Sequence, residues 1–347
     1  MEGGKYERGE RVILFTVGRV YKFNKNGNQA SSILQALSNA DTPVRRVARI
    51  FLDRRYCGQK YPLYGAGAIE ICIARPSAPT LRAMLTKHFL SGLAVALIFP
   101  LLGQAEIKLE TVEYQDGDTI CEGAVAFDDT GKTPRPGVLL VPDWMGAGDY
   151  AKSRAKQVAA LGYVCFVADI YGKGVRPANA GEASAQAGKY KADRPLLRQR
   201  VNAALAELKK NALVVKAKTC AMGYCFGGTT VLELARSGAE VAGVVSFHGG
   251  LDSLTPADGK KIKGKVLVLH GADDPFVKPA DLAAFQEEMR GNKVDWQMVY
   301  YGDAVHSFTN PNAGNDKSKG AAYQEAADKR SWEAMKEFYA EVFATAR

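Results

Sequence analysis

One short stretch constrains the fold of this chain more than any other, the sequence Gly-Tyr-Cys-Phe-Gly-Gly at residues 223–228. The apolar residues 219–222 before it are typical of a buried strand, and residues 229–235 after it are typical of a helix. Glycines on both sides of Cys225 allow the sharp, strained turn that joins a strand to a helix at close range. Such a turn directs a helix amino terminus at the Cys225 side chain, where the helix dipole favours a thiolate.

The partners that a cysteine nucleophile needs follow in the order typical of hydrolases with this turn, first a carboxylate and then a histidine. Residues 265–269 indicate a buried strand, and the carboxylates Asp273 and Asp274 come shortly after it. The spacing favours Asp274 and leaves Asp273 as the alternative. Residues 296–301 indicate the last strand, and His306 lies in the loop that follows, where the base is expected.

The chain holds only four histidines, so the base can also be chosen by elimination. His88 lies in a segment with a signal-peptide pattern, and His270 ends a strand, where packing is the expected role. His248 also ends a strand and is expected to line the pocket, but it precedes the carboxylate in the chain. His306 is therefore the predicted base.

Two backbone N–H groups are expected to stabilise a developing oxyanion. One belongs to Phe226, the residue after the nucleophile, and the second to the loop after an earlier strand. Residues 137–141 indicate that strand, so the second N–H is predicted to be that of Trp144. The adjacent Asp143 is predicted either to hold the resting thiol or steer water, or to cap the helix that begins near residue 150.

Strand and helix patterns alternate through the rest of the sequence. Strands are expected at 138–141, 164–169, 219–222, 241–247, 265–269 and 296–301, and helices at 150–161, 195–213, 229–237, 279–290 and 321–343. This alternation predicts an α/β fold with a mostly parallel central sheet covered by helices on both faces. The length of 106–347 suits one such domain.

Residues 84–105 show the three parts of a secretory signal peptide. A charged start is followed by an apolar run at 89–102, shorter than the roughly 20 residues of a membrane span. A small-residue cleavage site ends at Ala105, so Glu106 is the expected mature start, in a periplasmic or secreted protein. Because the pattern begins at Met84, residues 1–83 are interpreted as an upstream extension from a mis-called start, with no domain assigned; the alternative is a genuine basic extension.

Net charge supports the same division. Residues 1–105 hold 15 Lys and Arg against 6 Asp and Glu, which leaves 31 of each among residues 106–347. The net charge of +9 therefore belongs to the first part, and the domain has no basic excess to attract nucleic acid or an anionic membrane. We expect a small-molecule substrate, no nucleic-acid partner, no stable membrane insertion after cleavage, and a monomer or homodimer.

Four cysteines lie in the predicted mature domain, Cys121, Cys165, Cys220 and Cys225. No Cys-x-x-Cys occurs, and no spacing suggests a metal, so neither a metal nor a cofactor is expected. Export would permit a disulfide, for which Cys121–Cys165 is the only pair considered, with two free thiols as the alternative. Redox chemistry at Cys225 would need Cys220 to resolve it from five residues back along a strand, which is a poor geometry.

Several stretches together resemble the dienelactone hydrolase family of the α/β-hydrolase superfamily. They are Gly-Tyr-Cys-Phe-Gly-Gly at 223–228, Asp-x-x-Val at 274–277, Ala-Val-His-Ser-Phe at 304–308, and Gly-Tyr-Val at 162–164 leading to Ala-Asp-Ile-Tyr-Gly at 168–172. The resemblance covers residues 110–345. It implies an α/β-hydrolase fold, a triad of Cys225, His306 and Asp274, and hydrolysis of an ester or lactone through an acyl-enzyme without a cofactor.

Two positions depart from the lactone-cleaving members of that family. Those members carry a glutamate where this chain has Asp143, and an arginine that holds the substrate carboxylate where it has Asn310. Without that charged contact, dienelactone itself is expected to be a poor substrate, unless Arg176, Arg194 or Arg198 compensates. A second hypothesis is a binding domain that has kept the hydrolase fold without catalysis.

Overall fold

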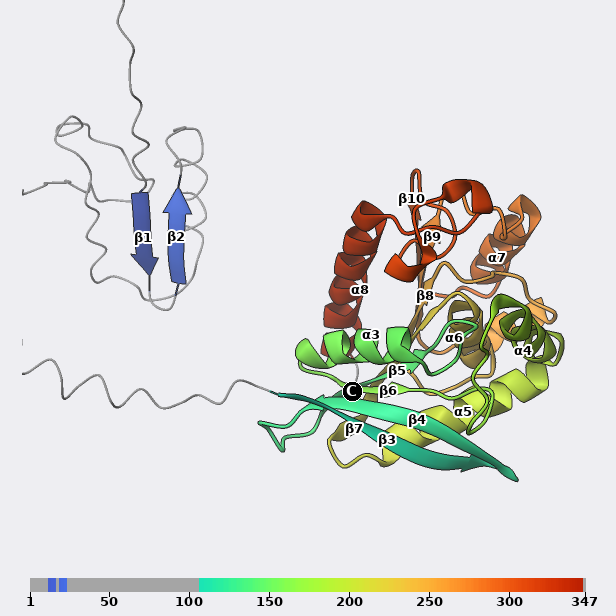
Figure 1. The fold of residues 1–347 in the computed structure, drawn as a ribbon, viewed down its shortest axis with the longest axis horizontal. Helices are drawn as coiled ribbons and strands as arrows, with labels where there is room; N and C mark the ends of the chain where they lie inside the picture. Colours follow the sequence, from blue (N-terminus) through green and yellow to red (C-terminus); the bar gives the residue numbers. More distant parts are fainter. Residues whose placement is uncertain (1–11, 17–18, 24–105, 346–347) are drawn as a thin grey trace, which may run out of the picture. The chain divides into compact units, whose positions relative to one another are not determined.

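The computed structural model describes residues 12–16, 19–23 and 106–345 (Figure 1). The chain divides into two compact units, Met1–Pro100 and Leu101–Arg347. In the first, β1 (Val12–Thr16) pairs with β2 (Arg19–Phe23) in an antiparallel manner. The predicted signal peptide at 84–105 lies outside the described residues.

The second unit is built on one eight-stranded sheet with the order β10-β9-β8-β7-β5-β6-β4-β3. Its strands are β3 (Ile107–Asp116), β4 (Thr119–Asp128), β5 (Arg135–Val141), β6 (Val164–Val167), β7 (Val214–Tyr224), β8 (Gly243–Phe247), β9 (Lys265–Gly271) and β10 (Trp296–Tyr301). Strands β5 to β10 run parallel to one another. Strand β4 pairs with both of its neighbours, β3 and β6, in an antiparallel manner. Strands β3 and β10 lie at the edges of the sheet. The predicted α/β fold with a mostly parallel sheet is confirmed.

Helices cover both faces of the sheet (Figure 1). On one face lie α3 (Asp149–Ala160) and α8 (Glu325–Thr345). On the other lie α4 (Ala180–Ala192), α5 (Arg194–Lys210), α6 (Phe226–Arg236) and α7 (Pro279–Gly291). Short 3₁₀ turns occupy η2 (Pro256–Lys261), η3 (Pro311–Ala313) and η4 (Lys317–Lys319).

Two apolar cores form because successive side chains of a strand point to opposite faces. In β5, Val138 and Leu140 pack under α3 and α8, whereas Leu139 and Val141 pack under the other helices. The same alternation separates Cys121 from Cys165, since each belongs to a different core. All four described cysteines are free thiols, so the considered Cys121–Cys165 disulfide is not formed.

The β3–β4 hairpin and helix α4 were not predicted. The hairpin turns at Gly117-Asp118, with Gly117 in the left-handed region at φ +56°, and a two-residue loop that begins with glycine is a recognised hairpin signal. Helix α4 begins with a reciprocal cap that resembles a capping box: the side chain of the N-cap residue Asn179 accepts from the N–H of Glu182, and the Glu182 carboxylate accepts from the N–H of Ala178, one residue before the N-cap. Both signals were present in the sequence.

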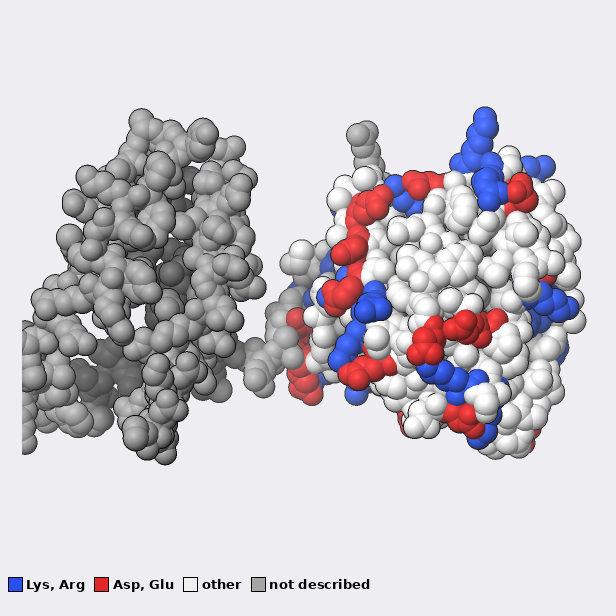
Figure 2. Space-filling model, turned by 90° about the horizontal axis from the view of Figure 1, so that it is seen from above, with Lys and Arg blue, Asp and Glu red and all other residues white. Residues whose placement is uncertain are grey.

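The loops that carry the predicted site residues all lie at the carboxyl ends of the parallel strands β5, β7, β9 and β10, and therefore on the same side of the sheet. Figure 2 shows that acidic and basic side chains are interspersed on the visible face of this unit, in keeping with its equal numbers of each. Within the described parts of the chain, no helix is both long and apolar enough to cross a membrane.

Candidate active site

Cys225 occupies the turn between β7 and α6, with φ 54° and ψ −115°. The turn is tight enough to require its glycines: a Cβ on Gly223 would lie 2.1 Å from the carbonyl oxygen of Gly227, and one on Gly227 would lie 2.1 Å from that of Val141. Cys225 is the N-cap residue of α6 and is partly exposed. Its sulfur therefore lies at the positive end of the helix dipole.

His306 lies in the loop after β10, and its Nδ1 is 2.8 Å from Oδ2 of Asp274. Asp274 is buried after β9, and its Oδ1 accepts a hydrogen bond from the N–H of Phe276 at 2.9 Å. Of the two carboxylates that the sequence left open, Asp274 is thus the one that contacts His306, while Asp273 is exposed. An anchored carboxylate of this kind fixes the orientation of the imidazole.

The protonation of His306 is set by opposing influences. Burial acts to lower the pKa of the His306 side chain, but the charge of Cys225, the hydrogen bonds to Asp274 and Cys225, and the charge of Asp274 raise it to about 10. The raised pKa favours the imidazolium form of His306, which can donate a proton to a group beside it.

Phe226 and Trp144 lie at the ends of neighbouring strands. Phe226 is the first residue of α6, so its N–H has no carbonyl one turn earlier in the helix to bond. Trp144 follows β5, and its carbonyl accepts a hydrogen bond of 3.0 Å from the Tyr171 hydroxyl, which orients this loop. Because β5 pairs with β7, the two loops meet beside Cys225.

Asp143 has a local role that the sequence did not indicate. Its Oδ1 accepts from the N–H of Met145 at 2.9 Å, which closes a turn within its own loop. The N-cap of α3 is Gly148, without a side-chain cap, so the alternative that Asp143 caps this helix is wrong. Burial raises the pKa of the Asp143 carboxyl, against the hydrogen bond from Met145 and the nearby charge of His306. A weakly acidic group thus lies close to His306.

The two remaining described histidines are buried. His270 packs its ring against Tyr300, as expected of a packing residue. His248 does not simply line a pocket: its Nδ1 lies 3.1 Å from the backbone N of Cys225, and its Nε2 lies 2.8 Å from Oγ1 of Thr309. Sequence reasoning did not find Thr309, because nothing in the sequence shows that β8 ends against the loop after β10.

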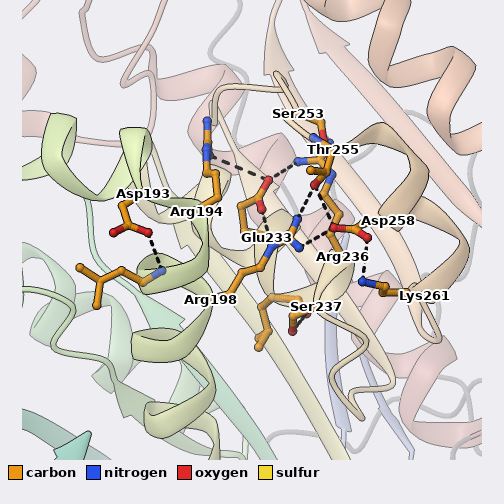
Figure 3. A network of polar contacts seen from close by, with 12 residues as sticks. Asp193, Arg194, Arg198, Glu233, Arg236, Ser237, Ser253, Thr255, Asp258 and Lys261 are labelled. Atoms are coloured by element: carbon orange, nitrogen blue, oxygen red, sulfur yellow. Dashed lines mark hydrogen bonds and ion pairs between the residues drawn. The ribbon is translucent and has the colours of Figure 1, made fainter. Parts of the chain in front are cut away.

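The arginines considered for substrate binding are already paired with carboxylates (Figure 3). Arg194 binds Asp252 at 2.6 Å, and Arg198 binds both Glu233 at 2.7 Å and Asp258 at 2.6 Å. These contacts join α5, α6 and the chain after β8. A substrate carboxylate would have to compete with these partners, so nothing here supports a substrate-binding role for Arg194 or Arg198.

The two other positions considered for a substrate carboxylate are also engaged. Arg176 donates to the carbonyls of Gly172, Val175 and Glu122 and lies 3.4 Å from Asp169. Asn310 uses its side-chain oxygen to accept from the N–H of Asn312, where it caps η3. Neither offers a free cation of the kind that holds a carboxylated lactone.

A strand order of this kind, a strained turn at Cys225 between β7 and a helix, and a histidine in the loop after the last strand define the α/β-hydrolase fold. The family model of the dienelactone hydrolase family matches residues 123–343. The chain belongs to the dienelactone hydrolase family.

Similar proteins include one of known structure, a dienelactone hydrolase-like promiscuous phosphotriesterase from metagenomic libraries. It is 41% identical, with a TM-score of 0.65, and the match covers 69% of this chain and 99% of that one. The solved structure named m3DLH is 39% identical with a TM-score of 0.66, covering 68% and 99%. An uncharacterised protein of Caenorhabditis elegans is 39% identical over 153 residues, which cover 43% of this chain and 95% of that protein.

Proposed function

We propose that this protein hydrolyses carboxylic esters or lactones through an acyl-enzyme on Cys225. The observation that carries the proposal is the position of His306, whose Nδ1 lies 2.8 Å from Asp274 and whose imidazole lies close enough to Cys225 for that residue to raise its pKa. Family membership supports hydrolysis. A relative in Saccharolobus solfataricus, 24% identical over 246 residues that cover 61% of this chain and 92% of that protein, bears the name carboxymethylenebutenolidase.

In the proposed mechanism, the thiolate of Cys225 attacks the acyl carbon while His306 holds the proton. The N–H groups of Phe226 and Trp144 stabilise the tetrahedral oxyanion. Collapse breaks the bond to the leaving alkoxide, which takes the proton from His306. His306 then accepts a proton from water, whose oxygen attacks the thioester, and the acid leaves as the thiolate reforms. Asp274 keeps the imidazole oriented throughout.

The paired arginines favour an uncharged substrate over dienelactone. Arg194 and Arg198 are held by carboxylates, and Asn310 supplies no charge. The exposed faces of Trp144 and Phe276 offer apolar contact instead. A neutral ester with an apolar acyl group is therefore the proposed substrate class, and a neutral phosphotriester belongs in the test because of the activity named for the relative with 41% identity.

The test compares the purified full-length protein with Cys225→Ala on p-nitrophenyl butyrate, an uncharged lactone and a neutral phosphotriester. We expect ester hydrolysis with a burst of p-nitrophenol, and a loss on the order of 10³-fold or more in Cys225→Ala. Cys220→Ala removes a buried thiol from β7, the strand that leads to Cys225, and serves as the matched control, which should retain activity. Equal rates in wild type and Cys225→Ala would refute the cysteine mechanism.

A non-catalytic binding domain remains the second proposal, and the same proteins separate it from the first. If wild-type Cys225 reacts with iodoacetamide at the rate of an ordinary thiol and no substrate is turned over, the binding domain is favoured. Rapid alkylation that is suppressed by a bound ester would favour the enzyme, because it requires an activated thiolate in the substrate site.

We also propose that the protein is exported, on the basis of the signal-peptide pattern at 84–105. Expression of the whole gene in a bacterium, followed by amino-terminal sequencing of the product from the periplasm or medium, tests this. A mature chain that begins at Glu106 is expected; a cytoplasmic product that retains residues 84–105 would contradict export.

A further inference from the structure

His248 directly follows β8, and its side chain contacts the backbone of Cys225, the proposed nucleophile. The backbone N–H of Cys225 donates both to the carbonyl of Phe247, at 3.0 Å, and to Nδ1 of His248, at 3.1 Å. His248 is only 2% exposed, so its ring cannot serve as a binding surface for substrate. Its backbone is held in the left-handed region at φ 39°, an uncommon conformation for a residue other than glycine. Such strain persists only where the surrounding structure holds the backbone in this conformation.

The contacts of His248 define its tautomer. Nδ1 faces an N–H donor and must therefore carry a lone pair, so the ring proton belongs to Nε2. Nε2 then donates to Oγ1 of Thr309 at 2.8 Å. Burial lowers the pKa of the His248 ring well below its usual value, and the nearby charge of His306 acts in the same direction. A neutral ring agrees with this arrangement, because a protonated ring would place two donors opposite each other.

Thr309 belongs to the loop that carries His306, three residues further along the chain. Its hydroxyl also lies 2.8 Å from the hydroxyl of Tyr150, and its carbonyl accepts from Arg154. Arg154 in turn pairs with Asp328 of α8 at 2.6 Å. The loop is thus anchored to both helices that cover this face of the sheet, and Thr309 itself is fully buried.

We propose that His248 is a positioning residue, which sets the distance between Cys225 and His306 by joining the backbone of the nucleophile to Thr309 in the histidine loop. The two reacting groups come from separate loops, after β7 and after β10, and these strands are not neighbours in the sheet. His248 contacts both loops at once, from a ring whose two nitrogens have fixed roles. This inference rests on the proposed function, since it assigns His248 to the Cys225–His306 pair.

The expected size of the effect follows from the sensitivity of reactions to geometry. A misplacement of about 1 Å can cost on the order of 100-fold in rate. Loss of the connection should therefore lower kcat and the alkylation rate of Cys225, with KM unchanged because His248 does not touch substrate. The ring centroids of His248 and His306 are 5.2 Å apart, so a loosened His248 ring would also remove packing from the base.

The experiment measures alkylation of Cys225 in the full-length protein by iodoacetamide, followed by peptide mass spectrometry, together with kcat and KM for p-nitrophenyl butyrate. His248→Asn keeps an acceptor near the Cys225 N–H but cannot reach Thr309, and Thr309→Val removes the hydroxyl at the other end. Each variant should lower the alkylation rate of Cys225 and kcat by about 10- to 100-fold, with KM unchanged. Thr309→Ser restores the hydroxyl and should stay near wild type.

Two further variants make the test specific. His270→Asn alters a histidine that is equally buried at the end of the adjacent strand β9 but does not contact Cys225. It should keep the wild-type alkylation rate even if the melting temperature falls. The double variant His248→Asn with Thr309→Val should be no slower than either single variant, because both break one connection.

Wild-type rates in either His248→Asn or Thr309→Val would overturn the proposal, and so would an equal loss of rate in His270→Asn. Because alkylation needs no substrate, the outcome is separate from that of the proposed function. A protein with an activated Cys225 that hydrolyses no ester would refute the proposed activity, yet the alkylation rates would still decide the role of His248.

Discussion

Phe276 places its ring beside the imidazole of His306 in a T-shaped contact, with centroids 5.3 Å apart. The ring is 60% exposed, so it contributes little to the core and is available to an incoming substrate. Its position next to the predicted base makes it a candidate wall for the acyl or leaving group of an apolar ester.

Phe276→Ala should therefore raise KM for p-nitrophenyl butyrate on the order of tenfold, which corresponds to about 1.4 kcal/mol of lost apolar contact. The value of kcat should change by no more than about threefold, since the variant removes uniform binding. Steady-state kinetics test this, with Phe276→Leu as a control that keeps apolar area. An unchanged KM would place the substrate elsewhere.

Asp143 allows a prediction about pH. The pKa of its carboxyl is raised by burial above the usual 3.8. As pH rises above 3.8, unfolded chains therefore lose this proton before the folded protein does, so the folded protein loses stability until the raised pKa has been passed. Asp143→Asn keeps the acceptor for the N–H of Met145 but does not titrate.

The unfolding free energy of Asp143→Asn should accordingly exceed that of wild type at pH 7, and the advantage should vanish below pH 3.8. Urea unfolding at both pH values provides the measurement. An advantage of equal size at the two pH values would show that titration of this carboxyl is not the cause.

At the scale of elements, the junction of β7 and α6 depends on backbone contact. A Cβ on Gly227 would lie 2.1 Å from the carbonyl oxygen of Val141 and 2.5 Å from that of Pro142, and backbone cannot move aside as a flexible side chain can. Gly227→Ala should push α6 away from β5 and cost at least about 2 kcal/mol of stability, as overpacking does.

Gly188→Ala is the matched control. Gly188 lies within α4, is exposed, and has open space where a Cβ would be added. This change should stabilise the protein by about 0.5–1 kcal/mol, because alanine loses less conformational freedom in a helix. Chemical denaturation of both variants decides the point. A Gly227→Ala protein as stable as wild type would show that the junction can relax.

The ion-pair network of Figure 3 connects helices α5 and α6. Arg236 of α6 is fully buried and binds Glu233 at 2.9 Å (Figure 3). It also binds Glu288 of α7 at 2.7 Å. Removal of one partner from a buried pair leaves charge without compensation, which costs about 3–5 kcal/mol. Arg236→Met should destabilise the protein by this amount.

Arg290→Met removes a comparable pair on the surface, since Arg290 and its partner Glu287 are both more than half exposed. Its cost should be about 0–1 kcal/mol. Thermal and urea unfolding of the two variants provide the comparison. Equal losses of unfolding free energy in the two variants would mean that burial does not make the ion pairs of Arg236 more costly to remove than an exposed pair.

At the scale of the molecule, both apolar cores and all eight strands of the large sheet lie within residues 106–345. A protein of residues 106–347 should therefore fold cooperatively, with a melting temperature within a few degrees of that of the full chain. Calorimetry of both proteins measures this. A molten product, with secondary structure but no cooperative transition, would show that earlier residues are needed.

Much of the large unit could be predicted because its parallel strands are continuous apolar runs, and β10 was predicted with its observed bounds, 296–301. The β3–β4 hairpin was overlooked because its strands mix polar and apolar residues, with one face partly exposed. Helix α4 was overlooked because it is rich in alanine and buries few side chains. In both, a local turn or cap signal was more informative than hydrophobicity.

In the candidate site, too, some residues could be predicted from the sequence and others could not. Short motifs indicated Cys225, Asp274 and His306, whose roles in catalysis stay predictions until the variants are measured. The contact of His248 with Cys225 could not be predicted, because it depends on β8 lying beside β7 in a register that pairs Phe247 with Tyr224. Pairing of distant strands is a property of the folded chain and leaves no local pattern in the sequence.

The outer strand β3 has a consequence for behaviour at high concentration. An edge strand presents unpaired backbone groups to which another molecule could add a strand, the first step of aggregation. Along its ten residues, β3 carries Lys108, Glu110 and Glu113, with both glutamates exposed. Approach of a second copy in register would bring like charges together and strip them of water. The edge that extends the sheet thus also discourages fibril growth.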